Sequence, residues 1–125
     1  IVTHVTIPNQ GWKSTYLKFR EKESFDWALS SVAVALKRNG NVCEEARVVL
    51  GGVAPIPWRS EQAEKVLQGK EITQSIAEQA GKAAVEGAFA LKDNEGKIPL
   101  TEALVKRAVL RIEEEPSAVK QSWVY

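Results

Sequence analysis

The sequence feature that most limits the fold is a glycine-containing turn between two apolar stretches. Residues 26–38 read DWALSSVAVALKR and residues 42–55 read VCEEARVVLGGVAP, so both are rich in β-branched and small side chains. Asn39 and Gly40 separate the two stretches, and this dipeptide suits the positive φ angles of a type I′ hairpin turn. The sequence therefore predicts two long antiparallel strands that are joined at Asn39 and Gly40.

Two stretches before this hairpin also alternate in the manner of β-strands. Residues 14–20 (STYLKFR) place Tyr16 on one side and Leu17 on the other, which predicts a third strand. Residues 1–8 (IVTHVTIP) alternate and then stop at a proline, which predicts a short strand that can belong to a neighbouring domain. We interpret His4 in this stretch as a surface residue, because the chain has no second histidine with which to share a metal.

After Pro57 the apolar residues recur at a spacing of about 3.6, which is the period of a helix. Glycine is common just past the end of a helix, and threonine is common as its N-cap. The spacing and these end signals predict, in order, a short helix over 63–67 closed by Gly69, a helix capped by Thr73 and reaching Ala88, a loop over 93–99, and a last helix over 101–113.

The predicted strands come before the predicted helices along the chain. This order favours an α+β fold in which a three-stranded antiparallel sheet is followed by about three helices packed on one of its faces. A doubly wound parallel sheet is disfavoured, because it would need strands and helices to alternate. The predicted core combines residues of both kinds of element: Val32, Val34, Val48, Leu50, Ile76, Leu104 and Ala108.

Length, charge and hydropathy exclude several classes of function. The 125 residues fit a single domain, and 17 basic against 16 acidic side chains give a net charge of +1. This balance offers no electrostatic reason to expect a nucleic-acid or membrane partner. No apolar run approaches the roughly 18 residues of a membrane-spanning helix, and no signal segment is recognisable, so we expect a cytoplasmic protein. The chain contains no methionine, and we therefore expect it to be a piece of a longer one.

No motif for nucleophilic catalysis, phosphate binding, zinc binding or dinucleotide binding is present. Cys43 is the only cysteine, and we interpret it as an ordinary small core residue. The Gly51 and Gly52 pair lies inside a strand pattern, where it indicates a bulge or a close backbone approach. Asp26 stays open to two interpretations, because it either caps a strand or faces something bound. Lys18 is consistent with the polar face of an edge strand.

Three segments of the chain resemble a known family. They are TYLKFREKESFDWALSSVAVAL (15–36), ARVVLGGVAPIPWRSEQAEKVL (46–67) and DNEGKIPLTEALVKRAVL (93–110). Together they resemble the C-terminal domain of the FAD-binding (medium) subunit of molybdenum hydroxylases, a group that includes xanthine dehydrogenase, aldehyde oxidoreductase and carbon monoxide dehydrogenase. The similarity covers about residues 12–112, and LGGVAPIPWR is its most specific string.

The resemblance implies a role in electron transfer. In this family the substrate is oxidised at a molybdenum cofactor, and FAD passes electrons from iron–sulfur (2Fe-2S) clusters to an external acceptor. The molybdenum cofactor and the clusters belong to partner subunits, and a preceding domain of the same subunit holds most of the FAD. The resemblance then divides the chain into the end of that FAD-binding domain with a linker (1–11), the C-terminal domain itself (12–115) and a tail (116–125).

The resemblance also implies which residues meet the cofactor. By motif position, Lys18 reaches the flavin from its strand, while Asp26 and Trp27 lie against the flavin ring from the loop that follows. Two positions depart from the family pattern, because Lys22 stands where many members have arginine, and Gly96 stands where an aromatic residue is common. An alternative function remains open at this point, namely a free-standing interaction module that keeps the fold without the redox role.

Overall fold

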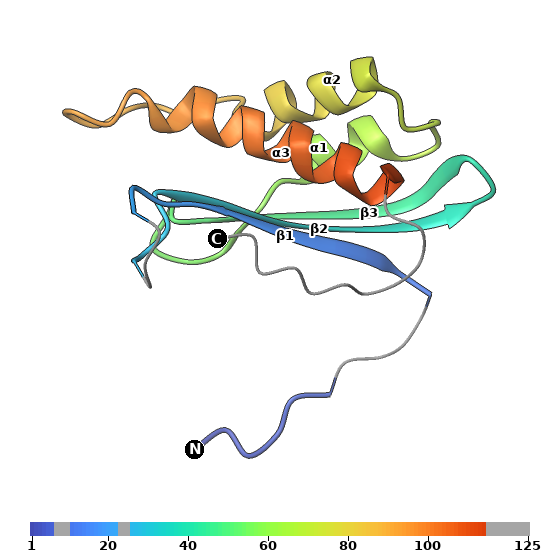
Figure 1. The fold of residues 1–125 in the computed structure, drawn as a ribbon, viewed down its shortest axis with the longest axis horizontal. Coiled ribbons are helices and arrows are strands. Elements are labelled where there is room, and N and C mark those ends of the chain that lie inside the picture. The colour runs from blue at the N-terminus through green and yellow to red at the C-terminus, as the bar shows by residue number, and fades with distance from the viewer. Residues whose placement is uncertain (7–10, 23–25, 115–125) are drawn as a thin grey trace.

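The chain folds into a sheet with a layer of helices on one of its faces (Figure 1). The computed structural model describes residues 1–6, 11–22 and 26–114. Its elements follow one another as β1 (Lys13–Phe19), β2 (Ser30–Asn39), β3 (Val42–Gly51), β4 (Trp58–Arg59), α1 (Glu61–Leu67), α2 (Gln74–Ala84) and α3 (Lys97–Glu114). The predicted α+β class and the order of strands before helices are therefore confirmed. Within these described ranges, no helix is both long enough and apolar enough to cross a membrane.

The sheet contains four strands in the order β1-β2-β3-β4, and every neighbouring pair is antiparallel. The prediction of three strands was wrong, because it missed β4. This strand pairs Trp58 with Leu50 and Arg59 with Val49 at the outer edge of β3. Two residues between a proline and a helix are too few to show an alternating pattern, so pairing with β3, rather than local sequence, defines β4.

The predicted hairpin joins β2 to β3, but its turn lies one residue later than expected. Asn39 pairs with Val42, which leaves Gly40 and Asn41 as the two loop residues. Gly40 has a φ of 61°, whereas Asn41 does not have a positive φ. A glycine with positive φ at the first loop position fits a type II′ turn rather than the predicted type I′ turn.

Three other boundaries differ from the sequence prediction. Residues 1–6 form no strand and are exposed, and residues 7 and 8 of the predicted strand lie outside the described residues. The second helix ends at Ala84, with Val85 as its C-cap, and the positive φ of 75° at Gly87 does not allow a helix to continue to Ala88. The last helix begins at Lys97, so it includes part of the predicted loop; a proline at position 99 is tolerated because the first turn of a helix needs no N–H donors.

The core lies between the sheet and the helices. The helix α3 packs on β1 and β2, α1 packs on β3, and α2 packs on the other two helices. Six of the seven predicted core residues are buried, whereas Ile76 is only partly buried at the edge of the core. The helices α2 and α3 come close at Gly81, where an added Cβ would lie 2.7 Å from the Glu102 carbonyl oxygen.

A buried carboxylate connects the sheet edge to α1. Glu64 is only 4% exposed and accepts hydrogen bonds from Arg59 Nε (2.9 Å), Arg59 Nη2 (2.7 Å) and the Val48 N–H (3.1 Å). Burial opposes ionisation of Glu64, but the hydrogen bonds from Arg59 and Val48 outweigh burial and lower the pKa of Glu64 below its ordinary value. The ionised form of Glu64 therefore stabilises the fold.

This pKa shift predicts how stability depends on pH. A carboxylate whose pKa is lower in the folded state stabilises the fold above its unfolded pKa of roughly 4.3, and this contribution is lost as pH falls through the folded value. We expect Glu64→Gln to lower the free energy of unfolding at pH 7 by roughly 1–3 kcal/mol, because it leaves buried donors poorly paired. The difference from wild type should shrink below about pH 4 in urea unfolding curves.

The control is Glu61→Gln, which removes an exposed carboxylate from the same helix. It should change the free energy of unfolding by less than about 0.5 kcal/mol. Equal losses in both variants, or a Glu64→Gln loss that stays constant down to pH 3, would contradict the role assigned to Glu64.

Candidate functional site

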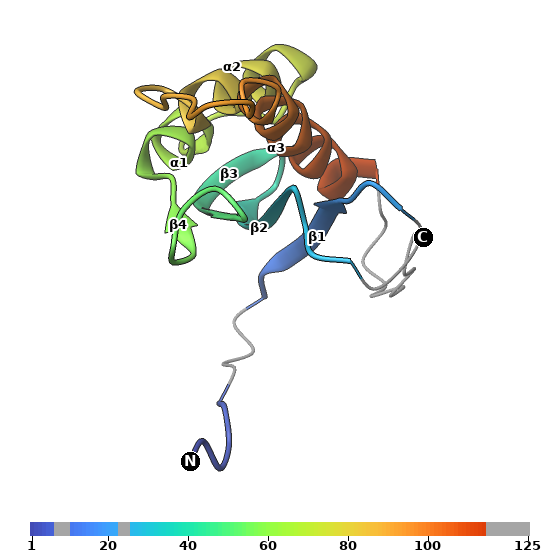
Figure 2. The ribbon, with the colours of Figure 1, turned by 90° about the vertical axis from the view of Figure 1, so that its left-hand side faces the viewer.

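The face of the sheet turned away from the helices is uncovered in the described part of the chain, and the N-terminal segment leaves from that side (Figure 2). Side chains alternate between the two faces of a strand. Because Leu17 packs against the core, Lys18 points to this open face, where its neighbour across β1 and β2 is Ser31. Ser31 in turn lies opposite Gly51 on β3. Lys18, Ser31 and Gly51 thus form a row across three strands at one end of the open face.

The loop between β1 and β2 carries the other two predicted site residues. A hydrogen bond from the Leu29 N–H to the Phe19 carbonyl (2.9 Å) closes this loop at its base. Trp27 is 96% exposed, which is unusual for a side chain with so much apolar surface. The structure therefore brings Lys18, Asp26 and Trp27 to the same end of the sheet.

The charges of Lys18 and Asp26 do not pair with each other. Both side chains are exposed, and neither has a hydrogen bond or an ion pair to another described residue. Asp26 precedes β2 by four positions, and its carboxylate accepts no hydrogen bond from the described residues at the start of that strand. The structure therefore does not support its interpretation as a strand cap. Lys18 does lie on the polar face of an edge strand, as expected.

The two glycines at the end of β3 allow the loops at this end to touch. Gly52 has a φ of 73°, and an added Cβ would lie 3.0 Å from the Ala28 carbonyl oxygen and 3.2 Å from that of Leu29. An added Cβ at Gly51 would collide with the Ser31 hydroxyl. The predicted close backbone approach is confirmed at Gly52, whereas the neighbour of Gly51 is the side chain of Ser31. The approach at Gly52 holds the segment that directly follows Trp27 against the loop between β3 and β4.

Helix α3 fixes the same loop from the helix side. Lys97 Nζ donates to the Gly52 carbonyl at 2.7 Å, and its own backbone carbonyl accepts from the Thr101 hydroxyl at 2.8 Å. Because the Thr101 hydroxyl is the donor in that bond, it accepts from Ser30 at the start of β2, at 2.7 Å. This chain of hydrogen bonds connects the start of β2, the first turn of α3 and the loop between β3 and β4 (residues 52–57), which we call the glycine loop.

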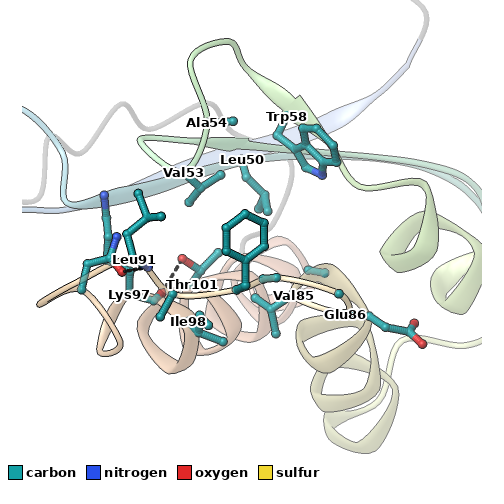
Figure 3. Close-up of a pocket in the computed structure, with 16 residues that line it drawn as sticks. Leu50, Val53, Ala54, Trp58, Val85, Glu86, Leu91, Lys97, Ile98 and Thr101 are labelled. Carbon is teal, nitrogen blue, oxygen red and sulfur yellow. Dashed lines mark hydrogen bonds between the residues drawn. The ribbon is translucent and has the colours of Figure 1, made fainter.

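A cleft of about 360 Å³ lies between the glycine loop and the segment that joins α2 to α3 (Figure 3). Its walls are mainly apolar, with Leu50, Val53, Trp58, Phe89, Leu91 and Ile98 among the residues that line it. The cleft was not predicted from the sequence, because its walls come from segments that lie far apart in the chain, from the end of β3 to the first turn of α3. None of Lys18, Asp26 and Trp27 lines it, so the cleft is separate from the predicted site.

Other titratable residues offer no second centre. Burial raises the pKa of the Cys43 thiol, while Arg38 lowers it and Glu113 raises it further, so this cysteine stays protonated and unreactive in the core. His4 is exposed, and its ring nitrogen Nδ1 forms a hydrogen bond with the Thr3 hydroxyl at 3.2 Å. Within residues 1–6, 11–22 and 26–114, no three acidic, histidine or cysteine side chains gather in a way that could hold a metal ion.

Residues 14–115 match the protein family described as the CO dehydrogenase flavoprotein C-terminal domain. The carbon monoxide dehydrogenase medium chain of Hydrogenophaga pseudoflava is 30% identical over 115 residues, which are 87% of this chain and 40% of that protein. The aldehyde oxidoreductase FAD-binding subunit of Escherichia coli is 41% identical over 68 residues, which are 54% of this chain and 20% of that protein.

The fold is also similar to a solved structure. Carbon monoxide dehydrogenase from Hydrogenophaga pseudoflava, in a form that lacks the Mo-pyranopterin moiety of the molybdenum cofactor, superposes with a TM-score of 0.76 at 29% identity. The match covers 84% of this chain and 38% of that chain. The chain therefore spans less than half the length of the relatives that it matches.

The contact at Gly52 predicts an asymmetry between two glycines. We expect Gly52→Ala to lower the free energy of unfolding by roughly 1–3 kcal/mol, through its positive φ and through contact with the Ala28 carbonyl. Gly69 is the matched control, because it has the same φ of 73° but open space around its Cβ position. Gly69→Ala should therefore cost less in urea unfolding, and equal losses would show that the two loops do not constrain each other at Gly52.

Proposed function

Because this chain belongs to the CO dehydrogenase flavoprotein C-terminal domain family, we propose that it forms one wall of the FAD site in the flavoprotein subunit of a molybdenum-containing hydroxylase. A preceding domain of the same subunit would hold the rest of the FAD, and residues 1–11 would lead into the C-terminal domain from it. The partners would be an iron–sulfur subunit and a molybdenum-cofactor subunit. When bound, FAD supplies the redox chemistry, taking electrons that come from the clusters and releasing them to an external acceptor.

The observation that carries this proposal is the group of unsatisfied side chains at one end of the open face. Trp27 exposes nearly its whole indole ring, while Lys18 and Asp26 have no partners among the described residues. Gly51 and Gly52 add no side chains to the surface beside them. An aromatic plane, a cation, an anion and bare backbone together fit a flat, polar ring such as that of a flavin.

Each of the three side chains has a separate physical role in this proposal. Trp27 packs on the ring and excludes water from it. The Lys18 ammonium favours negative charge on the ring, and the Asp26 carboxylate disfavours it, so the two side chains tune the ease of reduction in opposite directions. The lack of a glycine-rich phosphate loop in the 125 residues agrees with a site whose pyrophosphate is bound elsewhere in the subunit.

The alternative of a free-standing interaction module has no support from the relatives, which are named as medium chains or FAD-binding subunits of oxidoreductases. Those relatives act on different molecules, including carbon monoxide and glyceraldehyde, and the substrate of the complex does not follow from this domain. We place the complex in the cytoplasm as part of the same proposal, since the unpaired Cys43 suits a reducing compartment.

The test uses the complete subunit with FAD bound. We expect Trp27→Ala to weaken FAD binding by roughly twofold to tenfold, which corresponds to the loss of one aromatic pair, and to change the free energy of unfolding by less than about 0.5 kcal/mol. Asp26→Asn should raise the flavin midpoint potential, because it removes a negative charge beside the ring. Fluorescence titration and potentiometry measure the two effects.

Phe89→Ala is the matched control, because it removes another exposed aromatic ring, at the cleft. It should leave both FAD affinity and potential unchanged. The 125-residue chain alone should not retain FAD through gel filtration. Stoichiometric FAD on the isolated chain would show that the site has been misplaced, as would wild-type affinity and potential in both the Trp27 and the Asp26 variants.

A further inference from the structure

The open face of the sheet has two ends with different kinds of polar side chain. At the hairpin end the charges are paired, since Lys37 contacts Glu45 at 3.3 Å and Arg47 contacts Glu45 at 3.5 Å. The Arg47 guanidinium also lies 5.5 Å from the centre of the Trp12 ring. At the other end, Lys18 has no such partner among the described residues. Its neighbour across the strands is Ser31, which was not predicted as a site residue.

Ser31 is buried but its hydroxyl is not satisfied by the protein. Only 6% of the residue is exposed, yet its hydroxyl forms no hydrogen bond with any described residue. The adjacent Ser30 differs, because its hydroxyl points to the helix side and is bonded to Thr101. With no partner among the described residues, the Ser31 hydroxyl is left to bond to solvent or to a molecule that lies on the open face.

Gly51 explains how the Ser31 hydroxyl can be reached from outside. The oxygen of Ser31 lies so close to the Cβ position of Gly51 that a side chain there would collide with it, so the glycine leaves room for the Ser31 hydroxyl on this face. The Ser31 oxygen is not sealed inside the fold, because the fully enclosed atoms without a partner are Arg38 Nε and Glu113 Oε1. A ligand lying on the open face can therefore accept a hydrogen bond from Ser31.

We propose that Ser31 is a further flavin-binding residue, whose hydroxyl donates a hydrogen bond to an acceptor atom of the ring beside the Lys18 ammonium, on the surface that Gly51 leaves without a side chain. This inference rests on the proposed function. A planar ring suits the arrangement better than a phosphate group does, because one lysine and one hydroxyl stand on a flat strand surface without a helix N-terminus or a nest of backbone N–H groups. The ring would supply the partner that the Ser31 hydroxyl lacks.

The test measures FAD affinity and flavin potential in the complete subunit carrying Ser31→Ala. We expect the FAD dissociation constant to rise by roughly twofold to tenfold, as the loss of one hydrogen bond implies. The midpoint potential should become more negative, because the Ser31 hydroxyl stabilises the electron-rich reduced ring and the variant lacks this donor. Ser14→Ala is the matched control. Ser14 is exposed and lies on the open face of the sheet as Ser31 does, but at the opposite end of β1 from Lys18. The control should change neither quantity.

A second substitution tests the space rather than the donor. Gly51→Ala would place a methyl group where the Ser31 hydroxyl lies, and it should weaken FAD binding at least as much as Ser31→Ala does. If the Gly51 variant does not fold, Ser31→Ala still decides the inference.

The outcomes separate this inference from the proposed function. If Trp27→Ala and Lys18→Met weaken FAD binding or shift the potential while Ser31→Ala behaves as Ser14→Ala does, the role of Ser31 is overturned and the flavin site stands. If Ser31→Ala changes the thermal unfolding midpoint but neither FAD affinity nor potential, Ser31 is only structural and the inference is also wrong. If the wild-type subunit binds no FAD at all, the proposed function itself fails.

Discussion

The candidate site depends on the close backbone approach at Gly52. Without a side chain at this position, the loop between β3 and β4 lies directly against the backbone of Ala28 and Leu29. Lys97 then holds the Gly52 carbonyl from α3, so both loops at this end of the sheet are fixed relative to the helix layer. Backbone contacts therefore position the candidate site. The side chains of Lys18, Asp26 and Trp27 are exposed and are not needed to hold the loops in place.

The two faces of the sheet differ in what covers them. The helices bury the apolar side chains of one sheet face, and Glu64 with Arg59 closes the sheet edge at β4. The opposite face has no cover within the described residues, and the chain enters from that side. A sheet with one bare face is a natural half of a binding site between two domains. Such an arrangement agrees with a chain that spans less than half the length of its relatives.

Much of this fold follows from local sequence signals. Alternation marks β1, and runs of β-branched and small residues mark β2 and β3 with Gly40 in the turn between them. Ser60 and Thr73 cap the helices that they precede. The remaining features depend on contacts between distant residues. The strand β4 exists only through pairing with β3, and the burial of Glu64 requires Arg59 and the Val48 N–H to meet it. Neither contact leaves a periodic pattern in the sequence.

The candidate site was predictable only in part, and for a physical reason. Lys18, Asp26 and Trp27 came from the family resemblance, because a lone charge or an exposed aromatic residue has no meaning from spacing alone. Ser31 could not be found in this way, since serines are common and one serine in a strand of small residues carries no functional signal in the sequence. Its significance appears only when the strand register places it between Lys18 and Gly51.

Hydrogen–deuterium exchange of the complete subunit, with and without FAD, measures whether the cofactor lies against the open face of the sheet. FAD bound there is expected to slow exchange at the backbone amides of residues 26–31 and 51–53. Exchange in residues 85–91, which line the separate apolar cleft, should stay unchanged. Protection of residues 85–91 without any change at residues 26–31 would place the cofactor at the cleft and would contradict a flavin site on the open face.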